Sequence, residues 1–77
     1  MAIDKDNPYR KELVALLHSI DEETPLSEGN RIMILHVLNS EEKIKKFVEW
    51  VKSNLKEGKL KATEAEIARA AVQASKE

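Results

Sequence analysis

Cysteine is absent from this chain of 77 residues. Without a thiol, the chain can form no disulfide, no thiolate metal site and no cysteine nucleophile. It also has no segment near the roughly 18–20 apolar residues that a membrane-spanning helix needs. Its first six residues lack the basic stretch followed by an apolar stretch that is typical of a secretory signal. Together these absences predict a cytoplasmic protein with no membrane partner.

Glycine and proline are scarce, with two of each, and most of them mark expected helix ends. Asn7-Pro8 favours a helix start, because Asn caps well and Pro fits the first helical position. Thr24-Pro25 favours an interruption, since the residue before Pro is pushed away from the helical conformation. Glu57-Gly58 is expected to end a third helix, with Gly as a left-handed cap. Four helices are therefore predicted: one starting at Asn7-Pro8, one capped by Thr24 or Ser27 and ending near Asn39, one capped by Ser40, and one opened by the capping box Thr63–Glu66.

Only one long hydrophobic run is present, Ile32 to Leu38, and His36 is its single polar residue. On a helix its side chains point in nearly every direction, so the run predicts a central second helix covered by the other helices or by a partner chain. A buried strand is the alternative for a short, partly β-branched run. Because no other segment offers a strand to pair with it, we predict a helix.

The remaining apolar residues recur at helical spacing. The last segment has a small face of Ile67, Ala70, Ala71 and Ala74, which permits close helix approach but buries little area. We therefore expect an all-α fold: a compact bundle of four short helices in one domain of residues 1–77, with frayed ends at 1–6 and 76–77. The predicted core consists of Leu13, Leu16, Leu17, Ile20, Ile34, Leu35, Leu38, Ile44, Phe47, Val48, Val51 and Leu55.

The net charge is only −1, but the charges are unevenly distributed. Residues 1–30 contain seven acidic and three basic side chains, whereas residues 43–61 contain seven lysines and two glutamates. This polarity favours head-to-tail association or attraction of a charged partner, although lysines on a helix often serve only as a solvated surface. A nucleic-acid partner would be bound through its phosphates, because this segment has no arginine to read bases. The lysines concerned are Lys43, Lys46, Lys52, Lys56, Lys59 and Lys61.

Trp50 is the strongest candidate for a contact residue. On a helix it shares one ridge with Lys43, Lys46 and Asn54, and tryptophan is enriched among the residues that dominate binding energy at interfaces. The alternative is that the indole packs over another helix of the same chain, with the lysine stems lying along it. We predict Lys43, Lys46, Trp50 and Asn54 as interaction residues.

Motifs that carry catalysis or cofactor binding are missing from the sequence: there is no Gly-rich phosphate loop and no nucleophile motif. The two histidines, His18 and His36, lie far apart in the chain and predict no metal site. We accordingly expect no enzyme activity, no catalytic residues, no cofactor and no metal.

The function expected from these observations is that of a small cytoplasmic protein-interaction module or regulator. The alternative is a nucleic-acid-associated protein that uses the Lys-rich third helix and the following loop. Since the core is small, a protein partner or a homodimer is expected, with the contact on the third and fourth helices and Trp50 at or near it.

Overall fold

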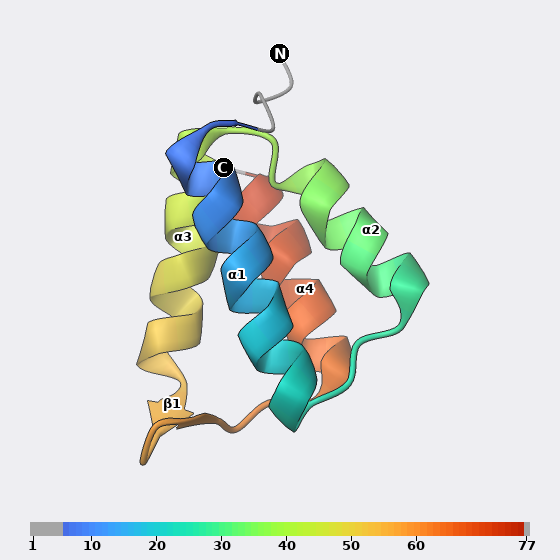
Figure 1. The fold of residues 1–77 in the computed structure, drawn as a ribbon, viewed down its shortest axis with the longest axis vertical. Coiled ribbons are helices and arrows are strands. Elements are labelled where there is room, and N and C mark those ends of the chain that lie inside the picture. Colours follow the sequence, from blue (N-terminus) through green and yellow to red (C-terminus); the bar gives the residue numbers. More distant parts are fainter. Residues whose placement is uncertain (1–5, 77) are drawn as a thin grey trace.

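The computed structural model describes residues 6–76, which form four helices and one short hairpin (Figure 1). The helices are α1 (Pro8–Glu23), α2 (Glu28–Val37), α3 (Glu41–Ser53) and α4 (Glu64–Ser75), and β1 (Leu55–Lys56) pairs antiparallel with β2 (Lys59–Leu60). The prediction of an all-α bundle of four short helices is confirmed. The frayed ends predicted at 1–6 and 76–77 lie outside the described residues, except for Asp6 and Lys76.

Each helix begins at a side chain that the sequence offers as a cap. The Asn7 side chain accepts a hydrogen bond from the Tyr9 backbone N–H at 2.8 Å, and Ser40 accepts one from Lys43 at 3.3 Å. Ser27, not Thr24, caps α2 by accepting from Asn30 at 3.2 Å. At α4 the predicted capping box is complete. These bonds satisfy backbone donors that have no partner within a helix.

The helices are arranged so that α1 and α4 each pack against both α2 and α3. α1 and α3 start at the same end of the bundle, where the Asn7 side chain donates to Glu41, and they run parallel from there. In Figure 1 both helices descend from the top of the view, α4 rises behind α1, and α2 rises at the right. Four short helices thus enclose one core, and no helix occupies its centre.

The expected central position of α2 is wrong. Ile34 and Leu38 are fully buried, but Ile32 is 59% exposed and Leu35 is only partly buried. Only the side of α2 that faces α1 and α4 is covered, so its apolar residues on the opposite side remain at the surface. The run Ile32–Leu38 is a helix up to Val37, as predicted, but it lies at the edge of the bundle.

The core otherwise follows the predicted helical spacing, with three exceptions among the predicted residues. Leu16 and Leu35 are partly buried, and Leu55 is 42% exposed. Leu55 lies outside the core because α3 ends at Ser53 and Leu55 belongs to β1. Five core residues were absent from the predicted set: Leu26, Leu60, Ile67, Ala71 and Ala74.

The hairpin was not predicted from the sequence. Glu57 and Gly58 have φ angles of 55° and 77°, the left-handed pair that a two-residue type I′ turn requires. Gly58 therefore makes a strand turn and does not cap α3, whose end is capped by Asn54. The turn reverses the chain so that Leu60 is buried against the bundle while Leu55 stays exposed.

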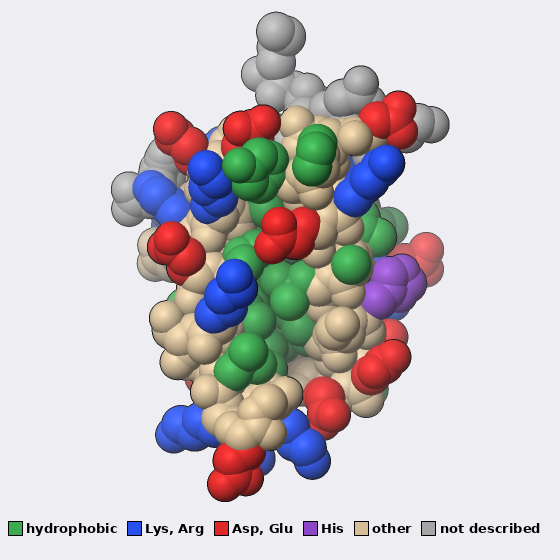
Figure 2. Space-filling view, turned by 60° about the vertical axis from the view of Figure 1, so that its left-hand side comes forward, with side chains coloured by type: hydrophobic (Ala, Val, Ile, Leu, Met, Phe, Trp, Pro, Cys, Tyr) green, Lys and Arg blue, Asp and Glu red, His purple; other side chains and the backbone are tan. Residues whose placement is uncertain are grey.

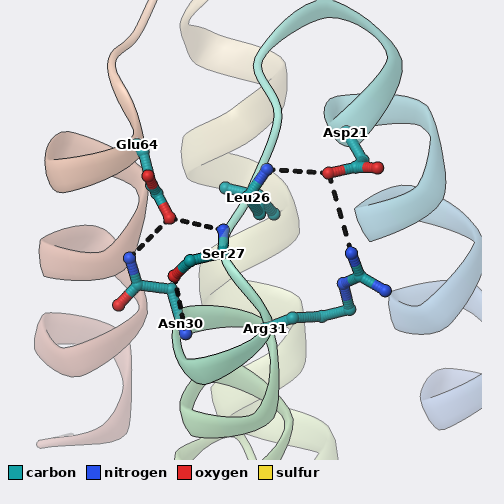
Figure 3. Close-up of polar contacts among 6 residues, drawn as sticks. All are labelled: Asp21, Leu26, Ser27, Asn30, Arg31 and Glu64. Carbon is teal, nitrogen blue, oxygen red and sulfur yellow. Dashed lines mark hydrogen bonds and ion pairs between the residues drawn. The ribbon is translucent and has the colours of Figure 1, made fainter.

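Side-chain hydrogen bonds and one ion pair fix the connection between α1 and α2 (Figure 3). Asp21 accepts from the Leu26 backbone N–H at 2.7 Å and pairs with Arg31 at 3.8 Å. Glu64, at the start of α4, accepts from the Ser27 backbone N–H at 2.6 Å and from the Asn30 side chain at 2.7 Å. These contacts hold the starts of α2 and α4 side by side.

Candidate interaction surface

A groove lies between α3 and α4, and Trp50 forms part of it. We call it the Trp50 groove; it has a volume of about 440 Å³. Its lining residues come from both helices: Lys46, Trp50, Glu66, Arg69, Ala70, Gln73 and Ala74. The small alanines of α4 leave room beside the indole, so the groove combines an apolar floor with a polar rim.

Trp50 is held in place by the core but is not enclosed by it. Its ring stacks on fully buried Phe47, with the ring centroids 6.2 Å apart and the planes at 19°. Its backbone carbonyl accepts a hydrogen bond from the Asn54 side chain at 2.7 Å. The indole itself is half-buried and lines the groove. Trp50 thus packs against the core on one side and lines the groove on the other, and its role as an interaction residue stays a prediction.

The structure brings two of the four predicted interaction residues together. Lys46 and Trp50 line the Trp50 groove, whereas Lys43 and Asn54 lie outside its lining. The Lys43 ammonium donates to the Asn39 side chain at 3.2 Å, and Asn54 caps the end of α3. Both outer residues therefore take part in local contacts at the two ends of the same helix.

Arg69 and Gln73 of α4 also line the groove, and the sequence reasoning missed both. They are exposed, and they lie four residues apart, so they share one helix face with Glu66 and Ala70. This helical spacing could have indicated a polar face on the last helix, but the prediction for this segment rested on its apolar face alone. Which α4 residues lie opposite Trp50 depends on the packing of α4 on α3.

The electrostatics of the groove are set by two cations and one engaged carboxylate. Hydrogen bonds from the Thr63 backbone N–H and then from its hydroxyl lower the pKa of Glu66 below its ordinary value. Glu66 is thus charged and directed toward the cap of α4. Lys46 and Arg69 supply positive charge beside Trp50, an arrangement suited to an apolar group with a neighbouring carboxylate.

The lysines of residues 43–61 do not form one surface. Lys46 lines the Trp50 groove, and Lys52 lies on the opposite side of α3, facing α1. Lys56 on β1 and Lys59 on β2 lie opposite each other in the register of the hairpin. Lys46 and Lys52 thus lie on different sides of α3, and the predicted alternative function remains a prediction.

Metal-ligating side chains do not gather anywhere in residues 6–76: no group of three or more His, Cys, Asp or Glu side chains could hold an ion there. Asp21 follows His18 by one helical turn, and both line a small cavity of about 20 Å³. The Asp21 carboxylate is already engaged by Leu26 and Arg31.

Comparison with known proteins gives no relative: no family model, no curated protein and no solved structure matches this chain. Within the part of the chain that is described, no helix combines the length and apolar character required to cross a bilayer. The Trp50 groove is therefore the basis for the function proposed below.

Proposed function

We propose that this chain is a small, non-catalytic protein-interaction module that binds a segment of a partner protein in the Trp50 groove. The observation that carries the proposal is that half-buried Trp50 and exposed Arg69 line one groove together with the alanines of α4. Tryptophan and arginine are the residue types most enriched where interface binding energy concentrates. The lack of cysteine is compatible with action in the reducing cytoplasm.

The chemistry of the groove favours a partner segment with an apolar side chain next to one or more carboxylates. The apolar side chain would lie against Trp50 and the alanines of α4, where contact removes apolar surface from water. The carboxylates would meet Lys46 and Arg69 at the rim. Such charges add specificity and speed association more than they add affinity.

A peptide-display library selected on the wild-type protein alone tests this proposal. We expect enriched peptides that contain an aromatic or branched aliphatic residue beside Asp or Glu. Binding of fluorescently labelled peptides is followed by anisotropy, which also reports on Trp50→Ala, the variant that lacks the single tryptophan of the chain. Trp50→Ala should weaken binding by about 2 kcal/mol, roughly thirtyfold.

Arg69→Ala and Lys46→Ala serve as further variants, with the exposed residue Lys11, on α1, mutated to alanine as the matched control. We expect weaker binding in the first two and unchanged binding in Lys11→Ala. Peptides that bind wild type and Trp50→Ala equally well, or a library that yields no enriched sequence, would contradict the proposed function.

A further inference from the structure

A second groove lies on the opposite side of α3, between α3, α1 and the hairpin. Figure 2 shows this face, where hydrophobic side chains form a hollowed strip with charged side chains along both edges. The groove has a volume of about 420 Å³ and continues toward the starts of α1 and α3 as a hollow of about 240 Å³. Its apolar lining includes Leu16, Val48 and the exposed Leu55. We call it the α1–α3 groove.

The two walls of this groove carry opposite charge. On the α1 wall the charged residues are Glu12 and Glu23. On the α3 wall they are Lys45 and Lys52, together with Glu49. Among residues 6–76, no hydrogen bond or ion pair engages the side chains of Glu12, Glu23 or Lys52. The Lys45 ammonium lies 5.1 Å from the centre of the Tyr9 ring. The acidic wall therefore stands beside an apolar strip with its charge available to a second molecule.

The opposite charges of the two walls lie at matching positions along the axes of α1 and α3. Glu12 lines the same hollow as Lys45 and Lys52, and Glu23 lines the same groove as Lys52. Because α1 and α3 run parallel, a two-fold axis along the helices would place the α3 wall of one copy opposite the α1 wall of another, at the same height. A two-fold contact of this kind uses the same patch on both copies and repeats each charge pair twice.

We infer that the α1–α3 groove is the homodimer interface of this protein, with a second copy of the chain as its occupant. The apolar strips of the two copies would face each other, and Leu55 would be covered there. Each acidic wall would meet the partner's basic wall. The interface is separate from the Trp50 groove, so it does not depend on the proposed function.

A charge-swap experiment tests this inference. One variant, Glu12→Lys/Glu23→Lys, makes both walls basic; the other, Lys45→Glu/Lys52→Glu, makes both walls predominantly acidic. Sedimentation equilibrium over a wide range of protein concentration gives the dimer dissociation constant. We expect the wild type to dimerise and each variant alone to dimerise at least about tenfold more weakly. An equimolar mixture of the two should form a 1:1 heterodimer, because both contacts are restored with the signs exchanged.

Two control variants have the same net charges but leave the groove intact: Glu22→Lys/Glu28→Lys and Lys11→Glu/Lys76→Glu. Each control should dimerise like the wild type, which separates a groove effect from an effect of overall charge. Three results would overturn the inference: a wild type that stays monomeric, swap variants that dimerise normally, or a mixture that does not pair. A dimer that survives both swaps but is lost in Trp50→Ala would instead place self-association at α3 and α4.

Discussion

At the residue scale, identical side chains on α2 have different roles according to which side of the helix they occupy. Ile34 is fully buried against α1 and α4, while Ile32, two residues earlier, is 59% exposed. A helix turns about 100° per residue, so a step of two residues moves a side chain from the covered side to the solvent side. The same hydrophobic residue therefore contributes to folding at one position and only to the surface at the other.

This pair provides a matched test of the core. Ile34→Ala should lower the free energy of unfolding by about 2–5 kcal/mol, because it removes buried methyl groups and leaves a cavity. Ile32→Ala should change it by no more than about 0.5 kcal/mol. Leu35→Ala should fall between the two, since Leu35 is partly buried. Urea unfolding of the three variants gives the comparison, and equal losses at positions 32 and 34 would mean that α2 is packed differently.

The hairpin turn allows a second test of single residues. Gly58→Ala should destabilise the protein by roughly 1–2 kcal/mol, because a Cβ is disfavoured at a φ of 77° even though it would meet no atom within 4 Å. Glu57→Asn should stabilise it by about 0.5 kcal/mol, because Asn-Gly is the preferred pair for this turn. Thermal unfolding measures both shifts. Stabilisation by Gly58→Ala would rule out the left-handed turn.

At the scale of elements, hydrogen bonds join the starts of α2 and α4, two helices that are distant in sequence. Glu64 on α4 accepts hydrogen bonds from the backbone N–H of Ser27 and from the side chain of Asn30, both at the start of α2 (Figure 3). These bonds, with the backbone N–H of Ser27 the largest cause, lower the pKa of Glu64 below its ordinary value of 4.5. The folded state thus holds Glu64 in its charged form.

This lowered pKa predicts a contribution to stability that depends on pH. The contribution is fully present above the ordinary pKa of 4.5 and is lost as the pH falls through the lower folded-state pKa, because protons bind first to the unfolded chain. Glu64→Gln should therefore flatten the acid side of the stability profile and lower stability at neutral pH. Glu22→Gln, an exposed change of the same charge, is the control. Chemical denaturation across the acid range measures the profiles, and parallel curves for wild type and Glu64→Gln would contradict the prediction.

The alternative function, nucleic-acid binding, leads to a prediction about the lysines of the hairpin and of the end of α3. If Lys56 and Lys59 of the hairpin and Lys52 of α3 bind nucleic acid, affinity should fall steeply between about 50 and 200 mM salt, because condensed counterions are released. Binding should show little sequence preference, since phosphates carry no base identity. Fluorescence anisotropy of labelled single- and double-stranded oligonucleotides measures this. No detectable binding at the lower salt concentration would remove nucleic acid as a partner.

At the scale of the whole molecule, α3 separates the two grooves. The Trp50 groove lies toward α4, and the α1–α3 groove lies toward α1 and the hairpin. Because different side chains of α3 line each groove, mutations in one should leave the other unchanged. The proposed partner segment and the proposed second copy would therefore occupy different sides of α3.

This separation predicts additive behaviour. Trp50→Ala should weaken peptide binding without changing the dimer dissociation constant, and Lys45→Glu/Lys52→Glu should do the reverse. Sedimentation equilibrium and peptide titration on both variants give the two constants. A change in both constants in either variant would show that the grooves are coupled or that the variant alters the fold.

The number of helices, the starts of three of them and most of the core could be predicted from the sequence, whereas the start of α2 was left open between Thr24 and Ser27. Caps such as Asn7, Ser40 and the Thr63–Glu66 box act through hydrogen bonds to residues two or three positions away, so they can be read without knowing the fold. The helical spacing of Leu13, Leu17 and Ile20 identifies a buried side for the same reason. The shared ridge of Lys46 and Trp50 was predicted in the same way, because they lie one turn apart on α3, and both line the Trp50 groove.

Which neighbours each helix meets follows from tertiary packing. The edge position of α2 and the place of Arg69 and Gln73 beside Trp50 depend on contacts between residues far apart in the chain. The hairpin depends on the left-handed conformation of Glu57 as well as Gly58, and glutamate gives no local signal for that conformation. Local patterns specify where helices begin and which side is apolar, whereas packing determines which apolar sides find a partner and which stay exposed.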